Sequence, residues 1–299
     1  MREIRRRLGI IGALLSLVAT LLASGCSTLT AARLAYNQAP ELAYWTLDAY
    51  ADFNGAQSLQ AKAVLARWQD WHRHTQLPLY AATLRALQAQ LPQDISADQA
   101  CSVVADARQT VMVSLYHVEP AAASLAATLQ PAQLEAMARK FAKSNAEWRG
   151  TYLTVAPQKA QAKRLEQATD RVEWLYGALN SAQNEVLKRS VSQSVFDAAL
   201  SDAERLRRQD DTLQTLRGVM ANNATATATV NATAAVHALV ARSFTSPNTA
   251  HRRYQDALTR EGCVLFAELH QRASAIQRNH AAQKLQRYES LLLSLAEPS

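Results

Sequence analysis

The stretch LPLYAATLRALQAQL, residues 77–91, decides the fold. Its large apolar residues recur three or four positions apart, and they are Leu77, Tyr80, Leu84, Leu87 and Leu91. This spacing puts them on one face of an α-helix, and such an apolar stripe has to be buried against a neighbour. The stretch therefore predicts an amphipathic helix that packs among other helices.

Similar stripes return over residues 134–152, 165–179 and 285–295, which predict three further amphipathic helices. No run of residues alternates apolar and polar side chains with the β-branched enrichment that is typical of strands. We therefore expect an all-α fold, a multi-helix bundle whose helices are joined by short capped turns.

A short motif marks the expected helix starts. Five times a polar residue stands three positions before a glutamine, in the pairs Asn54 and Gln57, Ser96 and Gln99, Gln130 and Gln133, Asn180 and Gln183, and Ser274 and Gln277. This is the arrangement of a capping box, in which the glutamine side chain accepts a hydrogen bond from the amide of the capping residue. Gln130 is a weak cap, although Pro131 suits the first helical position. We interpret these glutamines as helix starts and not as ligand-binding residues.

Proline-containing stretches supply other boundaries. We expect the helix of the opening stretch to end at Pro92, the next helix to break at Glu119–Pro120, and the last pair to open at Ser246–Asn248. The low-complexity stretch ANNATATATVNATAA, residues 221–235, predicts a loose connector that leads into a helix over 235–244, and a poorly packed helix and turn region is the alternative.

The N-terminus is typical of a targeting segment. Arg2 and Arg5–Arg7 form a positive region, Leu8–Ala23 is an apolar stretch too short to span a bilayer comfortably, and Leu22-Ala23-Ser24-Gly25-Cys26 resembles the bacterial lipobox. The alternative is an ordinary secretory peptide with an incidental cysteine. We expect a lipoprotein signal peptide over residues 1–25, a lipidated N-terminus with short helices over 26–52, and a helical domain over 53–299.

The lipobox resemblance implies that Cys26 becomes the first mature residue and carries three acyl chains, palmitate among them. Several acyl chains make membrane attachment stable, whereas one chain alone binds marginally. The next residue is Ser27 and not aspartate, which by the lipoprotein sorting rule implies the outer membrane. We therefore expect the membrane to be contacted through the lipid on Cys26, with the protein body in the periplasm.

The charge of the chain gives no nucleic-acid signature. The formal net charge of +7 includes four arginines and Glu3 of the signal peptide, so removing that segment lowers the charge by 3, to +4. The remaining charges are interspersed without a long basic run. We expect no nucleic-acid partner.

Two cysteines, Cys101 and Cys263, remain beside the lipidated one. An even pair of cysteines in an oxidising compartment is commonly bridged. We expect a disulfide between them, and two buried free thiols are the alternative, because sequence spacing does not show proximity.

The stretch WQDWHRHTQLPLY, residues 68–80, concentrates aromatic and basic side chains. Pro78 predicts a helix that ends near His74, a cap at Thr75 or Gln76, and a new helix from about Leu77. Two interpretations of this corner remain open. It is either a rigid turn, in which His72 or Arg73 bonds to helix-end carbonyls, or an exposed patch that contacts a partner through Trp68, Trp71, His72 and Arg73. Trp45 and Trp148 are further candidate contact residues.

The chain shows no recognisable catalytic or cofactor motif. His72 and His74 are two positions apart, which points them to different sides of a helix, and no other histidines have the four-residue spacing of helical zinc ligands. There is no phosphate-binding glycine loop and no nucleophile elbow. We assign no catalytic residues, metal ligands or cofactor. An envelope hydrolase is the least favoured class, and it would need His72, Arg73 and a carboxylate gathered in one pocket.

Several segments besides the lipobox carry a resemblance across nearly the whole mature chain. They are Arg33-Leu34-Ala35-Tyr36-Asn37, Tyr50-Ala51-Asp52-Phe53 with Gln57, Trp71-His72-Arg73, Leu77-Pro78-Leu79-Tyr80, Phe266-Ala267-Glu268-Leu269-His270, Gln277-Arg278 and Lys284-Leu285-Gln286-Arg287-Tyr288. Together they are similar to an uncharacterised proteobacterial lipoprotein family, a domain of unknown function. The resemblance implies a helical lipoprotein and supplies no activity.

These observations favour a lipid-anchored cell-envelope protein that is not an enzyme and that binds an unidentified envelope macromolecule, such as another envelope protein. The alternative is a periplasmic chaperone or stress-sensing module. The glutamine motifs resemble the leucine-threonine-x-x-glutamine motifs of small, all-helical periplasmic chaperones that bind unfolded clients, although only a few residues match.

Overall fold

The computed structural model describes residues 27–222 and 228–297, so the expected signal peptide and Cys26 lie outside the described residues. Every regular element in the described part is a helix, which confirms the all-α prediction. In chain order they are α2 (Ser27–Asn37), α3 (Ala39–Ala51), α4 (Gly55–Trp71), the π-helical turn η1 (His72–Gln76), α5 (Leu77–Gln90), α6 (Ala97–Ala126), α7 (Pro131–Tyr152), α8 (Pro157–Tyr176), α9 (Ser181–Ser192), α10 (Ala198–Ala221), α11 (Ala228–Phe244), α12 (Thr249–Gln271) and α13 (Ala275–Ala296). None of the described helices combines the length and apolar character needed to cross a bilayer.

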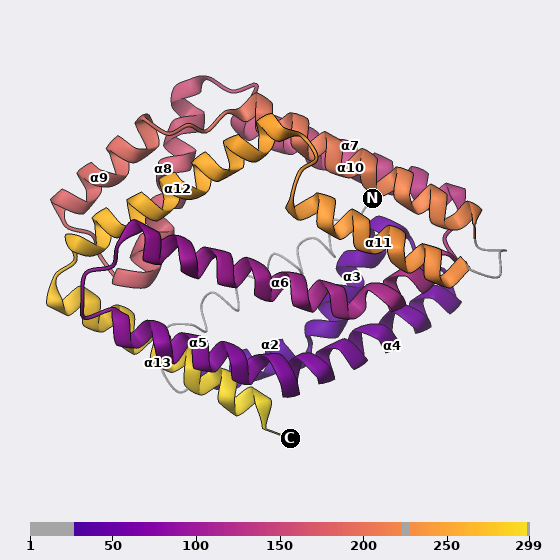
Figure 1. Ribbon diagram of the computed structural model, residues 1–299, viewed down its shortest axis with the longest axis horizontal. Coiled ribbons are helices and arrows are strands. Elements are labelled where there is room, and N and C mark those ends of the chain that lie inside the picture. Colours follow the sequence, from indigo (N-terminus) through magenta and orange to yellow (C-terminus); the bar gives the residue numbers. More distant parts are fainter. Residues whose placement is uncertain (1–26, 223–227, 298–299) are drawn as a thin grey trace, which may run out of the picture.

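The helices form an elongated frame that the long helix α6 crosses (Figure 1). The first lobe contains α5, α8, α9, α12 and α13, and the second lobe contains α3, α4, α7, α10 and α11. The N-terminal part of α6 packs on α12 in the first lobe, and its C-terminal part packs on α11 in the second. Helix α6 is therefore shared by both lobes.

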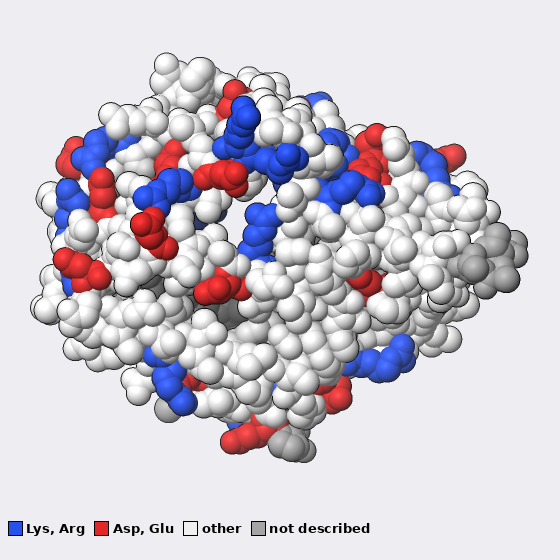
Figure 2. All heavy atoms as spheres, in the orientation of Figure 1, with Lys and Arg blue, Asp and Glu red and all other residues white. Residues whose placement is uncertain are grey.

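The apolar core is divided into four separate clusters and does not form one centre. Two clusters belong to the first lobe, around Leu91 with Tyr176 and around Leu187 with Leu269. The other two belong to the second lobe, around Leu134 with Met137 and around Ala123 with Val236. Each lobe thus has its own core, and the space between the lobes is left open. Figure 2 shows this face hollowed near its centre, with acidic and basic side chains gathered around the hollow.

The glutamines of the predicted capping boxes begin helices, as expected. Asn54, Ser96, Asn180 and Ser274 accept hydrogen bonds from the N3 amides of α4, α6, α9 and α13, and the N3 glutamine side chains accept from the amides of the caps. At α7, the Gln133 side chain accepts from the Gln130 amide, while the Gln133 amide donates to the Gln130 carbonyl. The weak cap Gln130 is thus replaced by a backbone bond within the turn.

Four of these glutamines also pair with each other across the fold. The Gln57 amide nitrogen donates to Gln133 Oε1 over 3.2 Å, and the Gln133 amide nitrogen donates to Gln57 Oε1 over 2.8 Å. Gln133 also donates to the Ala51 carbonyl, and Gln57 to the Thr128 carbonyl, each over 2.8 Å. This pair joins the α3–α4 turn to the α6–α7 turn in the second lobe.

The first lobe has an equivalent pair. The Gln277 amide nitrogen donates to Gln183 Oε1 and to the Ala178 carbonyl, each over 2.9 Å. The Gln183 amide nitrogen donates to the Leu269 carbonyl over 3.5 Å. This pair joins the α8–α9 turn to the α12–α13 turn. All four paired glutamines are buried, whereas Gln99, whose side chain accepts only from the Ser96 amide, is exposed.

Cys101 in α6 and Cys263 in α12 form the expected disulfide, which joins residues 162 positions apart. Closing so long a loop restricts the unfolded chain, and a link of this kind typically stabilises the fold by roughly 2–5 kcal/mol. It fixes the N-terminal part of α6 to the first lobe.

Two of the expected boundaries are wrong. Helix α6 does not break at Glu119–Pro120 but continues to Ala126. Pro120 itself is exposed, while the residues that follow it on the buried face, such as Ala123, pack against α11, and this packing outweighs the lost backbone bond.

The connector prediction also fails over 228–235, because α11 begins at Ala228. Ala232 and Val236 are buried against α6 and α10, so this stretch forms a helix with a buried face. Residues 223–227 of the predicted connector lie outside the described residues.

The buried glutamine pairs predict an unequal effect of two similar substitutions. Gln133→Ala removes one half of a buried pair, so Gln57 loses the hydrogen bonds to its partner glutamine and the Ala51 carbonyl loses a donor. It should lower the free energy of unfolding by about 2–4 kcal/mol. Gln99→Ala removes the same capping contact at an exposed helix start and should cost only about 1 kcal/mol. Urea unfolding followed by circular dichroism measures both, and equal losses would contradict a role for the pairing.

Candidate functional site

The Trp68–Tyr80 stretch is not a corner between two helices, which corrects the sequence interpretation. Helices α4 and α5 are continuous through η1, where neither Thr75 nor Gln76 caps a new helix. The Leu77 amide donates to the His72 carbonyl, five residues back. Pro78 has no amide hydrogen and would disturb a regular α-helix, and the wider π turn directly before it lets the chain continue.

The side chains of this turn bind other parts of the fold. Trp68 Nε1 donates to the Ser114 carbonyl of α6 over 3.1 Å. The Trp71 ring stacks on His117 of α6, with 3.7 Å between the ring centroids and 6° between the planes. His72 stacks on Trp68, and its Nδ1 lies 3.0 Å from the Tyr36 hydroxyl. The two tryptophans therefore dock η1 on α6.

Arg73 connects the same turn to both ends of the described chain. It donates over 2.7 Å to the Leu295 carbonyl in the last turn of α13 and over 2.7 Å to the Asn37 side chain at the end of α2. The expectation that His72 or Arg73 bonds to a helix-end carbonyl is thus confirmed for Arg73, although the carbonyl belongs to a distant helix. In the described part of the chain, neither residue contacts a carboxylate.

All four residues of the candidate patch are half-buried. Burial lowers the pKa of His72 because the charged imidazolium would lose its hydration. Of the two other tryptophans, Trp148 is half-buried beside Tyr152, while Trp45 in α3 is 53% exposed. The aromatic patch is therefore mainly a junction that joins α2, η1, α6 and α13.

The middle of α6 is a surface that sequence analysis did not identify. Every residue from Val104 to Gln109 is exposed, which is more than a full turn of the helix that crosses the centre of the frame (Figure 1). Within this segment Arg108 donates to the Phe244 carbonyl and the Thr245 hydroxyl at the end of α11, and the other side chains face solvent. The hollow in Figure 2 and this exposed turn together show that the space between the lobes reaches α6.

Apolar side chains remain in this exposed part of α6. Val104 is 47% exposed, Val111 49% and Val113 39%, and the charged residues beside them are Asp106 and Arg108. A helix that bridges solvent between two lobes is usually polar on every face. We refer to residues 104–113 as the α6 bridge. Its exposed valines are typical of a surface that binds a partner.

Charged side chains on α10 hold the second lobe together beside this bridge. Glu204 is buried and accepts hydrogen bonds from Arg207, Arg208 and Ser246 over 2.8–3.1 Å. Asp211 accepts from Arg242 of α11 over 2.8 Å. This network ties α10 to α11 and to the turn before α12.

Two opposing effects set the pKa of Glu204. Burial alone would raise it, but the hydrogen bonds from Arg207, Arg208 and Ser246 favour the carboxylate and together lower the pKa to about 2. The buried His251 lies close by, with its Nδ1 3.9 Å from Glu204 Oε2. Arg207 and Arg208 neutralise the charge of the buried Glu204 carboxylate, so the arrangement is that of a structural ion-pair network.

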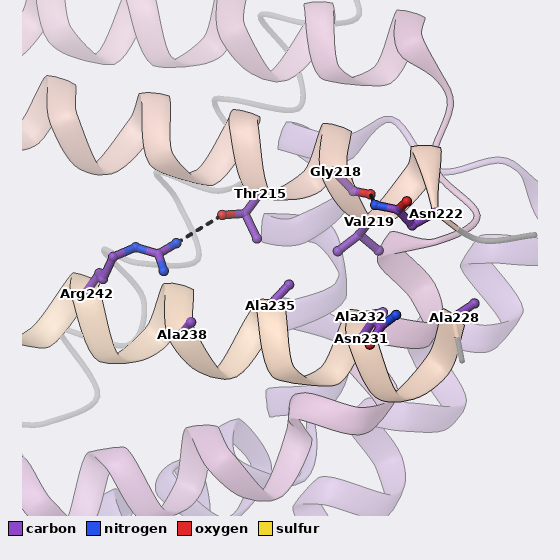
Figure 3. A pocket seen from close by; sticks show the side chains of 10 residues that line it. All are labelled: Thr215, Gly218, Val219, Asn222, Ala228, Asn231, Ala232, Ala235, Ala238 and Arg242. Carbon is purple, nitrogen blue, oxygen red and sulfur yellow. Dashed lines mark hydrogen bonds between the residues drawn. The ribbon is translucent and has the colours of Figure 1, made fainter. Parts of the chain in front are cut away.

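Small side chains leave a hollow of about 250 Å³ between α10 and α11 (Figure 3). One wall carries Thr215, Gly218 and Val219, and the other is formed by alanines of the low-complexity stretch. Arg242 closes one end by donating to Thr215 Oγ1 over 3.3 Å. No set of three or more histidine, cysteine, aspartate or glutamate side chains in the described residues has the geometry to hold a metal ion.

Comparison with known sequences identifies the family. The sequence profile of a family of unknown function, DUF6279, matches residues 49–228, so the chain belongs to this family. The matched part includes the complete α6 bridge. No curated protein and no solved structure matches the chain at a significant level.

The Glu204 network predicts how stability depends on pH. The pKa of Glu204 is lower in the folded chain than in the unfolded chain, so its stabilising effect is complete above pH 4.5 and is lost as the pH falls towards 2. Glu204→Gln should therefore lower the free energy of unfolding by about 2–3 kcal/mol at pH 7, and the difference from the native chain should shrink towards pH 2.

Denaturant titrations at several pH values measure this difference. Glu135→Gln is the matched control, because that side chain is 74% exposed and its partner Arg139 lies 3.9 Å away. It should change stability little at any pH. A Glu204→Gln loss that stays constant from pH 7 to pH 2 would contradict the assigned network.

Proposed function

We propose that this member of a family of unknown function is a lipid-anchored cell-envelope protein that binds another envelope macromolecule and does not transform it. The observation that carries the proposal is the α6 bridge, an exposed helix segment with apolar side chains inside an open frame. Exposed apolar side chains gathered at one place are typical of interaction surfaces. A partner that entered the space beside α6 would bury Val104, Val111 and Val113.

The construction of the frame supports binding. Both ends of α6 are fixed, one by the Cys101–Cys263 disulfide and the other by packing on α11. A surface held rigidly at both ends loses little conformational freedom when it binds, which favours affinity. Each glutamine pair fixes two turns within its own lobe. The space between the lobes beside α6 is therefore present before a partner binds.

The N-terminal helices support attachment to a membrane. Helix α2 begins at Ser27, directly after the lipobox cysteine, and α3 follows after one residue. Leu34 is 63% exposed, Leu42 48% and Trp45 53%. Leucine and tryptophan side chains are suited to the bilayer interface. We infer that the lipid on Cys26 holds α2 and α3 near the membrane, with the body in the periplasm and, because Ser27 follows the cysteine, at the outer membrane.

A periplasmic chaperone is the second candidate, and one observation favours it. Exposed large apolar side chains are spread over many helices: in addition to those of the α6 bridge, they include Leu59, Leu79 and Leu200. Dispersed apolar contacts suit unfolded clients, which have no fixed shape, better than a single folded partner.

Lipidation has a direct test. Cells that express the native chain and are fed a palmitate analogue should label the protein, and the label should lie on the N-terminal peptide that begins at Cys26. Cys26→Ala removes the thiol that forms the thioether, so this variant should lose the label and keep its uncleaved signal peptide. A native chain without label, or a Cys26→Ala protein that is labelled and cleaved like the native chain, would contradict the lipid anchor.

The α6 bridge is tested by photocrosslinking in the intact envelope. A photoreactive residue at Val111 should give adducts of discrete mass, because a bound partner would cover this position. The matched control is Leu200, which is 44% exposed against 49% for Val111 but lies on α10. The same probe there should give at least about fivefold less adduct if the partner binds at the bridge.

The Val111→Asp variant gives a second test of binding at the α6 bridge. A charge in the apolar contact should weaken recovery of the Val111 partner about tenfold, whereas Leu200→Asp should not. A broad smear of adducts at both positions, together with suppression of aggregation of an unfolded client by the purified protein, would favour the chaperone. Absence of adducts at Val111 would contradict binding at the bridge.

A further inference from the structure

A cavity of about 520 Å³ lies in the first lobe, between α5, α6, α8, α12 and α13. Its lining is almost entirely apolar and includes Leu87, Leu91, Val103, Trp174, Phe266 and Leu285. The volume lies in the range of cavities that bind small molecules, and such cavities are mostly apolar with few polar groups. The cavity is distinct from the α6 bridge, although Val104 lies at the border of both.

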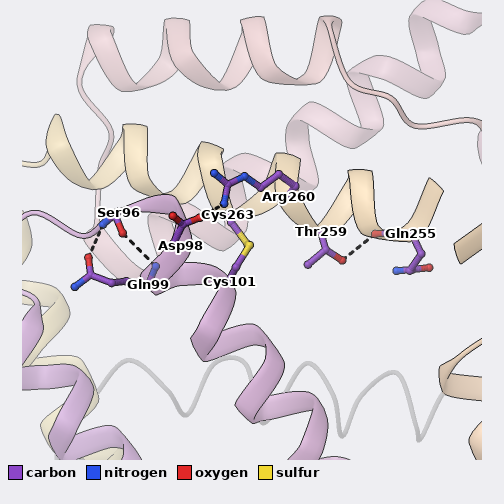
Figure 4. The surroundings of a disulfide bond; sticks show 8 residues. All are labelled: Ser96, Asp98, Gln99, Cys101, Gln255, Thr259, Arg260 and Cys263. Carbon is purple, nitrogen blue, oxygen red and sulfur yellow. Dashed lines mark hydrogen bonds and ion pairs between the residues drawn. A yellow bond between two sulfur atoms is a disulfide. The ribbon is translucent and has the colours of Figure 1, made fainter. Parts of the chain in front are cut away.

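The walls of the cavity are rigid. Cys263 lines it and is bound to Cys101 of α6 (Figure 4), and Leu91, Ile95 and Ala100 are buried in the same cluster. At the start of α6, the capping box and the ion pair of Arg260 with Asp98 hold this corner in place (Figure 4). Because these walls are fixed from outside, neighbouring side chains are not free to fill the space.

Positive charge lies next to Trp174, one of the residues that line the cavity. Trp174 is 49% exposed, and the Lys284 ammonium lies 4.3 Å from the centre of its ring and donates to its backbone carbonyl. Arg287 is on the next turn of α13 and is exposed. Burial, and then the charge of Arg287, lowers the pKa of Lys284. An anion beside Lys284 would stabilise its charged ammonium form and so offset both causes of the lowered pKa.

We propose that this cavity binds a long-chain fatty acid, with its acyl chain among the apolar side chains and its carboxylate beside Lys284 and Arg287. An acyl chain gains by leaving water for an apolar space, and a carboxylate pairs with ammonium and guanidinium groups. A leucine or phenylalanine side chain of a protein partner fits less well, because it would fill the apolar space without bringing a negative charge beside Lys284 and Arg287. The proposal does not depend on the binding of a macromolecule at the α6 bridge.

Photolabelling of the native lipid-anchored chain tests the proposal. The chain is reconstituted in vesicles of phosphatidylethanolamine and phosphatidylglycerol, mixed with palmitic acid that carries a diazirine at the end of the chain, and irradiated. Mass spectrometry should place the label on peptides around Leu91, Val103 and Phe266. Label confined to exposed peptides would overturn the proposal.

A cavity-filling variant sharpens the test. Gly262 lines the cavity, and a Cβ atom added there meets no atom within 4 Å. Gly262→Phe should occupy the space and lower labelling about tenfold. Gly150→Phe is the matched control, because Gly150 is also helical and equally free of close neighbours but lines no part of the cavity. Equal labelling of the two variants at the cavity would overturn the proposal.

The head group is tested separately, which keeps the proposal falsifiable if Gly262→Phe does not fold. Lys284→Gln combined with Arg287→Gln should lower labelling by the acid about tenfold and leave labelling by the corresponding diazirine alcohol unchanged. Labelling by the acid that does not respond to these substitutions would overturn the assigned carboxylate position. Stronger cavity labelling by a diazirine phosphatidylglycerol than by the acid would overturn the fatty acid as the ligand.

Discussion

The two buried glutamine pairs are the interaction on which the rest of the structure depends. Each paired glutamine caps its own helix and also donates an amide hydrogen bond to the opposite turn, so one buried side chain fixes two helix ends. In the second lobe the pair joins Gln57 to Gln133, and in the first lobe it joins Gln183 to Gln277. Buried amides without partners are costly, and this cost fixes the register in which the turns meet.

This constraint explains why the frame is open. Each lobe has its own cores and its own glutamine pair, so neither needs apolar contact with the other across the centre. Helix α6 is left to span the distance, fixed at one end by Cys101 and at the other by Ala123. Its exposed middle is therefore a consequence of how the lobes are built. The same rigidity keeps the apolar cavity of the first lobe from collapsing.

The sequence predicts what depends on neighbouring residues and fails where distant segments meet. Capping boxes such as Asn180 with Gln183 are local, so the helix starts are correct, but the pairing of Gln183 with Gln277 spans 94 positions and leaves no local signal. Pro78 lies in the first turn of α5, as predicted, but no corner precedes it, because a π turn can accommodate a proline within a continuous helix. Val111 has the apolar character of a core residue, and only the separation of the lobes exposes it.

A double-mutant cycle on Gln57 and Gln133 tests this account most directly. The free energies of unfolding of Gln57→Ala, Gln133→Ala and the double variant give the coupling between the two side chains. The account predicts a coupling of about 1–3 kcal/mol, because the second substitution removes a partner that the first has already lost. The same cycle on Gln57 and Gln277, which belong to different lobes, should give additive losses. Additive losses for Gln57 and Gln133 would contradict the claim that the pair holds the second lobe together.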